Sequence, residues 1–440
     1  MSALQLEQNR LDTVLAERVD EVAYDLDSPS APDRLMERIG NAHYVLLGEA
    51  SHGTSEYYTW RARLSQKLIR EKGFSFIAVE GDWPDCYRVN RYIKGYPDAG
   101  SSAFAVLHAF NRWPTWMWAN WEIVAFAEWL RRHNTGHEYK VGYYGLDVYS
   151  LWESMHSIVD YLSKTNDPEA VKLAKQAYRC FEPYSEDPQA YAWSTRMVTE
   201  DCEDEVVELL IELLRKTPRY DSDVEGALSA EQNAYIMVNA ERYYRAMVRS
   251  DVQSWNIRDG HMADTLDRLM KFHGPDAKGI VWAHNTHVGD ARATDMARVG
   301  MQNIGQMVRE RHQAEGVVLA GFASYRGTVI AGREWGAPME RMPLPEAQQS
   351  SWEDILHRAR TYNKLLVIEE FNEDEDFLAS RGHRAIGVVY DPATERFGNY
   401  VPTVLPNRYD ALLYLDKTEA LHPLHIEPVE GMPDTFPWGL

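Results

Sequence analysis

The stretch VLLGEASHGTSEYY, Val45–Tyr58, decides the fold because its character changes in the middle. Its apolar start predicts a buried β-strand, and its polar continuation contains Glu49 and, three residues later, His52. An apolar strand without alternation is typical of a sheet that is covered on both faces. Ligands of open α/β sheets bind beyond the carboxyl ends of the strands, so Glu49 and His52 are candidate functional residues.

Short runs of β-branched and apolar residues elsewhere in the chain predict further strands. The whole set is His43–Leu47, Phe74–Val79, Lys140–Leu146, Gly279–Ala283, Gly316–Phe322, Lys364–Ile368 and Ala385–Tyr390. Helical patterns at Thr59–Glu71 and Trp118–His133 separate the first three of them. This order predicts an α/β fold, with a mostly parallel central sheet flanked by helices in three layers.

The strand signal disappears between about residues 150 and 272, where apolar residues recur at helical spacing. We therefore expect an all-helical insertion there, within a single α/β domain that spans residues 1–440. Ser229, followed three residues later by Gln232, is typical of a capping box for the middle helix of this block. Scattered prolines from about Pro402 predict a surface-packed extension that continues to residue 440.

The composition limits the partners and the location of the protein. Its formal net charge is −21, from 46 basic and 67 acidic side chains, which disfavours nucleic acid and anionic membranes as partners. The first residues lack the pattern of a signal peptide and no run approaches ~20 apolar residues, so we expect a cytoplasmic protein. Cys86, Cys180 and Cys202 form no CxxC pattern, which argues against a disulfide framework and a cysteine metal site.

Acidic and histidine side chains follow the first four predicted strands. They are Glu49 and His52 after the first strand, Glu80 and then Asp82 after the second, Asp147 after the third, and His284 and His287 after the fourth. Because the carboxyl ends of parallel strands meet at one edge of a sheet, we expect these side chains to surround one pocket.

Three chemistries suit this set. A histidine can act as the general base that activates water, while a glutamate orients its ring. Glu49 and His52, with His284 and His287, also offer nitrogen and oxygen ligands to a metal, although HExxH and HxxEH are absent. A serine nucleophile at Ser51 is disfavoured, because Glu49 stands where the G-x-S-x-G elbow needs glycine. A P-loop and a G-x-G-x-x-G are missing, which argues against nucleotide and dinucleotide chemistry.

Two arginines and two tryptophans extend the candidate site. Arg61 lies in the first predicted helix, and Arg258 shares a helical face with apolar residues, so its guanidinium requires acceptors. We interpret Arg258 either as a clamp on an oxyanion or on the glutamates, or as the partner of a structural carboxylate such as Asp259. Trp113 and Trp116 precede a predicted helix and are candidates to line an apolar cleft.

Five motifs together resemble those of the erythromycin esterase family, which includes succinoglycan biosynthesis protein-like members. They are LLGEASHGTSEYYTWR, FIAVEGDWPD, RWPTWMWANWE, SWNIRDGHMA and VWAHNTHV, and they run from about Val45 to His287. The resemblance implies an α/β core with a helical insertion, and a water-based opening of a macrolide lactone without an essential metal. It also implies site roles: His52 as the base that activates water, Glu49 and Glu80 as active-site acids, and Arg61, Arg258, His284 and His287 as further site residues.

From the residues and the resemblance we expect a hydrolase of carboxylic esters or lactones, with macrolides as candidate substrates and with no cofactor. Its partner would be a small-molecule ester or lactone bound beside Trp113, Trp116 and Asp147. Two alternatives stay open. One is a metal-dependent hydrolase that uses the same histidines and glutamates, and the other is a ligand-binding protein of the same fold without enzymatic activity.

Overall fold

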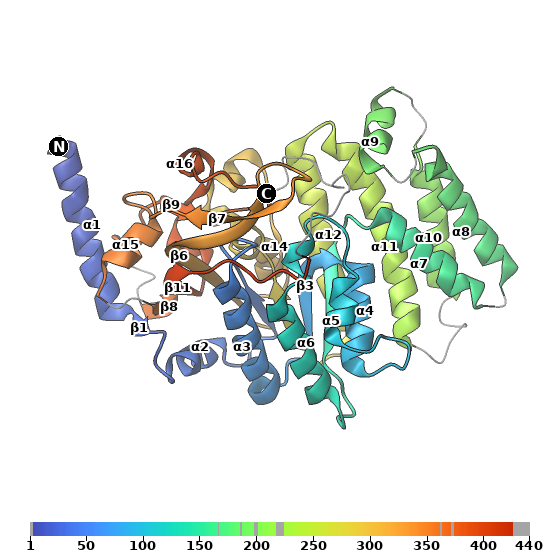
Figure 1. Ribbon diagram of the computed structural model, residues 1–440, viewed down its shortest axis with the longest axis horizontal. Coiled ribbons are helices and arrows are strands. Elements are labelled where there is room, and N and C mark those ends of the chain that lie inside the picture. Colours follow the sequence, from blue (N-terminus) through green and yellow to red (C-terminus); the bar gives the residue numbers. More distant parts are fainter. Residues whose placement is uncertain are drawn as a thin grey trace.

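The computed structural model describes residues 3–165, 167–184, 187–197, 201–216, 224–360, 363–370 and 374–425. Within them, nine strands form one sheet in the order β1-β8-β11-β6-β2-β5-β3-β4, with β7 paired to β6 (Figure 1). The bounds are β1 Tyr24–Asp25, β2 Tyr44–Leu47, β3 Phe76–Asp82, β4 Gly142–Asp147, β5 Gly279–Trp282, β6 Val317–Gly332, β7 Met339–Leu344, β8 Lys364–Val367 and β11 Ala411–Thr418. Neighbours from β11 to β4 are parallel, and β1, β7 and β8 add antiparallel pairs. The predicted mostly parallel sheet is confirmed.

Side chains alternate between the two faces of the sheet, and helices cover both. In β2, Tyr44 and Leu46 join one buried cluster, whereas Val45 and Leu47 join the other. The first cluster contains residues of α11 (Val224–Met247), α12 (Asp251–His273) and α14 (Ile304–Arg311), and the second contains residues of α2 (Ala31–Ile39), α3 (Ser55–Lys72) and α6 (Trp121–Asn134). This arrangement confirms the three-layer α/β fold.

Further helices join the sheet to the rest of the chain. They are α1 Ala3–Val22, α4 Trp83–Lys94, α5 Ala103–His108, α13 Asn285–Val288, α15 Trp352–Arg358, α16 Glu395–Gly398 and α17 Leu405–Arg408. None of the helices within the described residues is both long and apolar enough to cross a bilayer.

The described part of the predicted helical insertion contains helices and no strand. It comprises α7 Leu151–Ser163, α8 Pro168–Phe181, α9 Pro188–Met197 and α10 Glu203–Lys216, followed by α11 and α12. Figure 1 shows α7 to α10 at one end of the molecule, while α12 reaches the sheet. The helical insertion therefore meets the α/β core through α12, α11 and α7.

The predicted capping box at Ser229 is wrong, because α11 already begins at Val224 and Ser229 lies inside it. The two side chains make tertiary contacts instead. Ser229 accepts a hydrogen bond from Trp83 Nε1 at 3.1 Å, and Gln232 Nε2 donates to Thr265 Oγ1 at 2.8 Å. These two polar residues therefore connect α11 to α4 and α12, and they do not cap its N-terminus.

Two predictions about the C-terminal part are wrong. Ala385–Tyr390 is not a strand; Ile386 and Tyr390 pack on the β6–β7 hairpin, and the preceding residues form β9 (Arg381–Arg384), which pairs with β10 (Tyr400–Thr403). The extension expected from about Pro402 contains β11, which is buried between β6 and β8. Residues 426–440 of that extension lie outside the described residues.

The prediction that the cysteines form no disulfide is also wrong. Cys180 at the end of α8 and Cys202 just before α10 form a disulfide 22 residues apart in sequence. Helices α8 and α10 pack against each other, which brings the two thiols together without any local sequence signal. Cys86 is buried and is the free cysteine among the described residues.

The loop that follows β2 is pressed against β6 at Gly53. The carbonyl oxygen of Gly53 accepts hydrogen bonds from the backbone nitrogens of Ile330 and Leu421, each at 3.0 Å. A Cβ atom on Gly53 would lie 1.9 Å from the carbonyl oxygen of Ile330. Glycine is therefore required beside His52, because any larger residue would push the loop away from the sheet.

We predict that Gly53→Ala lowers the free energy of unfolding by roughly 1–3 kcal/mol, the usual cost of overpacking. Gly260→Ala is the matched control. Gly260 lies in α12 with no atom within 4 Å of an added Cβ, so this change should be neutral or stabilising by up to about 1 kcal/mol. Urea unfolding of both variants measures the difference, and equal stabilities would contradict the close packing at Gly53.

Candidate active site

The loop after β2 and helix α3 together hold a buried chain of three charged or titratable side chains. His52 Nδ1 lies 3.0 Å from Glu49 Oε1, and Arg61 Nη2 donates to Glu49 Oε2 at 2.6 Å. Arg61 is fully buried, and its guanidinium packs 4.3 Å from the ring of Tyr58 and 4.9 Å from that of Trp282. A neutral His52 that donates its Nδ1–H to Glu49 therefore keeps the lone pair of Nε2 free for a proton.

Glu80, at the end of β3, faces His52 across a short gap. Its Oε1 lies 4.0 Å from His52 Nε2, and its Oε2 accepts a hydrogen bond from the backbone nitrogen of His284 at 2.8 Å. Burial works to raise the pKa of Glu80, but the cations His287 and Arg258 hold it well below its usual value. Glu80 is therefore a carboxylate.

Arg258, from α12, is the charged centre of the site. It donates to Glu80 Oε1 at 2.7 Å and to both oxygens of Asp147, through Nε at 3.0 Å and Nη2 at 2.7 Å. Arg258 therefore contacts a candidate catalytic glutamate, Glu80, and is also the partner of a second carboxylate, Asp147. Asp259 is not its partner and lies on His287 instead.

His287 lies behind Arg258 in a closed setting. Both oxygens of Asp259 lie 2.9 Å from its Nδ1, and the ring of Trp255 stacks on it at 4.6 Å. Burial works to lower the pKa of His287, but Asp259 and Glu80 raise it to about 9. Its Nε2 lies 3.4 Å from Glu80 Oε1 and 3.1 Å from Arg258 Nη1. When His287 is protonated, Nε2–H donates to Glu80. When His287 is neutral, Nε2 accepts a hydrogen bond from Arg258.

His284 is neutral and lies beneath His52. The backbone nitrogen of Thr286 donates to its Nδ1 at 3.3 Å, and its Nε2 is buried without a hydrogen-bond partner among the described residues. Burial, together with the nearby His52, lowers the pKa of His284 well below its usual value. The two rings are 5.0 Å apart, so His284 shapes the pocket behind the proposed base instead of titrating.

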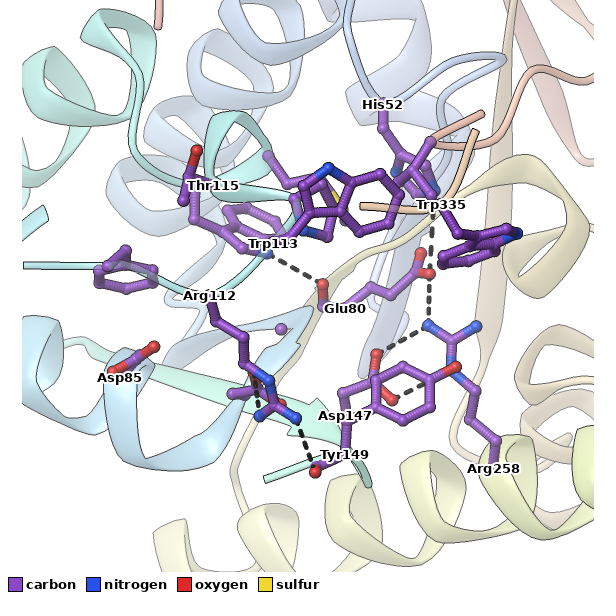
Figure 2. Close-up of a pocket in the computed structure, with 17 residues that line it drawn as sticks. His52, Glu80, Asp85, Arg112, Trp113, Thr115, Asp147, Tyr149, Arg258 and Trp335 are labelled. Atoms are coloured by element: carbon purple, nitrogen blue, oxygen red, sulfur yellow. Dashed lines mark hydrogen bonds and ion pairs between the residues drawn. The ribbon is translucent and has the colours of Figure 1, made fainter. Parts of the chain in front are cut away.

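A cavity of about 90 Å³ opens above these groups. Figure 2 shows Trp113 and Trp335 on one side of Glu80, with Asp147 and Arg258 on the other. Trp113 Nε1 donates to the carbonyl oxygen of Ala337 at 3.0 Å, and its ring lies 5.1 Å from that of Trp335. The cavity thus has a charged floor, built from strand ends and α12, and an aromatic wall, built from the segment between α5 and α6 and from the β6–β7 hairpin.

The predicted site residues divide into two groups. His52, Glu80, Asp147, Arg258 and Trp113 line the cavity. The others are placed behind this first group: Glu49, Arg61, His284 and His287 are buried against it, and Trp116 is buried edge-on against Trp113 at 5.6 Å. The expectation that Trp116 lines the cleft is therefore wrong, because Trp113 covers it.

Sequence reasoning missed several residues of the site, among them Arg112 and Tyr149, which line the cavity. Asp259 stands inside the SWNIRDGHMA motif, but only its contact with His287 shows its place in the charge network. Trp335 lies in the turn between β6 and β7, where no periodicity marks it, and only the fold brings it to Trp113. Among the described residues, no group of three or more histidine, cysteine, aspartate or glutamate side chains is placed to hold a metal ion.

We predict that the charge on His287 makes stability fall at alkaline pH. An unfolded histidine has a pKa near ~6.5. Because the folded pKa is raised to about 9, the stabilisation is complete below the unfolded value and is lost as pH rises through the folded one. Between these limits wild type should lose up to about 3 kcal/mol more than His287→Gln in urea unfolding. Parallel losses in the two proteins would contradict a charged His287.

Comparison with known proteins identifies the family. A family model described as erythromycin esterase matches residues 69–418, which is most of the chain. The chain is similar to a putative hydrolase, YbfO, of Bacillus subtilis (strain 168), with 20% identity over 90% of each protein. It is also similar to an erythromycin esterase type II of Escherichia coli, with 22% identity over 77% of this chain and 84% of that protein.

Solved structures share the fold. A succinoglycan biosynthesis protein superposes with a TM-score of 0.76 at 22% identity, covering 93% of this chain and 98% of that one. A mutant erythromycin esterase, EreC, in its open conformation superposes with a TM-score of 0.64 at 17% identity, covering 88% and 93%. Family membership supports an esterase or hydrolase role at the level of the family. Because the family model matches residues 69–418, more than half of the chain, the chain belongs to the erythromycin esterase family.

Proposed function

We propose that the protein hydrolyses carboxylic esters or lactones with a water molecule that His52 activates. The observation that carries this proposal is the 4.0 Å gap between His52 Nε2 and Glu80 Oε1 at the floor of the cavity. The gap is too long for a direct hydrogen bond and suits a water that contacts both atoms.

In the proposed reaction, His52 Nε2 takes a proton from this water as the oxygen attacks the carbonyl carbon. Glu49 stabilises the imidazolium through Nδ1, and Arg61 balances the charge of Glu49. The cationic Arg258 lines the same cavity, so it lowers the energy of the oxyanion that forms. Every group in this scheme belongs to the chain itself.

The size of the cavity bears on the substrate. Pockets for drug-sized ligands measure about 300–1,000 Å³, whereas this cavity measures about 90 Å³. Small esters and lactones therefore fit the arrangement described above. A macrolide, the substrate class that the family name implies, is larger than this cavity.

The metal-dependent alternative uses the same histidines and glutamates. Several of their donor atoms are already engaged: His287 Nδ1 by Asp259, and both oxygens of Glu80 by Arg258 and His284. Tightly bound metal together with turnover that chelators abolish would favour this alternative. Tight ligand binding without turnover of any ester or lactone would favour a non-enzymatic binding protein.

We predict that His52→Gln lowers kcat/KM for hydrolysis by about 10²–10⁴-fold, the usual contribution of a general base. The measurement is a mass-spectrometric screen of simple esters, lactones and macrolides for the gain of one water. His422→Gln is the matched control, since His422 is exposed and pairs with Glu122 away from the cavity. Full activity in His52→Gln would remove the proposed base.

A further inference from the structure

A second acid, Asp82, shares the cavity with Glu80. It closes β3 and stands opposite Asp147 of β4 in the register of the sheet, after a bulge that begins at Val79. Asp82 lines the cavity. Its Oδ2 accepts a hydrogen bond from Arg112 Nη1 at 3.0 Å, and its Oδ1 is buried without a hydrogen-bond partner among the described residues.

The charges around Asp82 are mostly negative. Arg112, from the segment after α5, is the cation in contact with it, and Arg112 also lies 3.5 Å from Glu153 of α7. Asp147 of β4 and Asp85 of α4 add two further carboxylates, although Arg258 and Arg88, respectively, bind them. Burial, reinforced by these carboxylates and opposed by Arg112, raises the pKa of Asp82 to about 8. At neutral pH its carboxyl therefore carries a proton, and Oδ1 is the oxygen free to hold it.

Three other cavity groups, Glu80, Asp147 and His52, are poorly placed to protonate a leaving group. Glu80 is ionised, and both oxygens of Asp147 accept from Arg258. His52 is the group that takes the proton of the attacking water in the proposed reaction. An alkoxide that leaves an ester is a strong base and needs a proton at the moment of cleavage.

Resting on the hydrolase function proposed above, we propose that Asp82 is the general acid that protonates the leaving alcohol. His52 first removes a proton from water, the water oxygen bonds to the carbonyl carbon, and the carbonyl electron pair moves to its oxygen. That pair then re-forms the carbonyl as the bond from carbon to the leaving oxygen breaks. The leaving oxygen takes the proton of Asp82, and the proton on His52 returns to Asp82 through water. The sum is ester plus water giving acid plus alcohol.

The test compares two esters with the same acyl group, a p-nitrophenyl ester and an alkyl ester. Nitrophenolate leaves without protonation, whereas an alkoxide does not. Asp82→Asn should therefore lower kcat/KM for the alkyl ester by about 10²-fold or more and change that for the nitrophenyl ester only a few-fold. In wild type, turnover of the alkyl ester should fall as pH rises above about 8, and this basic limb should be missing in the variant.

Two further variants complete the design. Glu153→Gln removes a carboxylate that helps to raise the pKa of Asp82 and that does not line the cavity, so it should move the basic limb to lower pH, opposite to Arg112→Gln. Arg112→Gln removes the cation at Asp82, so it should move the basic limb to higher pH even if Asp82→Asn does not fold. Equal losses for both esters in Asp82→Asn, or an unmoved limb in Arg112→Gln, would overturn the acid role and leave the hydrolase standing. A wild type that cleaves neither ester, lactone nor macrolide would instead overturn the proposed function itself.

Discussion

The buried guanidinium of Arg258 is the interaction on which the site depends. It comes from α12 of the helical insertion and binds carboxylates at the ends of β3 and β4, so one side chain joins the two parts of the fold at the cavity floor. Removing one partner of a buried ion pair typically costs about 3–5 kcal/mol, because the other charge is left uncompensated. The site and its attachment to the helical insertion are therefore a single structural unit.

The other buried charges of the site are also paired with a charge of opposite sign. Glu49 is matched by Arg61, and Asp259 is matched by His287. Each cation is held by ring stacking or a cation–π contact as well as by its carboxylate. His52 is left as the group that faces the cavity with a nitrogen free to take a proton.

Much of this architecture could be predicted from the sequence, because buried parallel strands appear in a sequence as short apolar runs. Strands β2 to β5 were predicted in this way, and so was the gathering of side chains at their ends. The prediction failed where long-range packing decides the outcome. Ser229 fits a capping pattern but accepts a hydrogen bond from Trp83 inside a helix. The apolar residues from Ala385 to Tyr390 pack on the β6–β7 hairpin and do not form a strand. Strand β11 lies in a segment whose scattered prolines predicted a surface extension.

The depth of each site residue could not be predicted, because sequence order does not record which side chain covers another. Trp116 and His284 have neighbours that reach the cavity before them. Trp335 arrives from a turn more than two hundred residues after Trp113 in the sequence. Such placements follow from long-range packing in the folded chain and not from the conformational preferences of neighbouring residues.

The position of β11 has a consequence for the way the polypeptide matures. The ribosome makes this strand after every other strand described, yet β11 lies between β6 and β8 in the interior of the sheet. Until β11 emerges, β6 and β8 have unpaired backbone groups in the nascent chain. Such exposed strand edges can pair with strands of other chains and aggregate. Protection by chaperones during translation is thus most needed just before the last strand arrives.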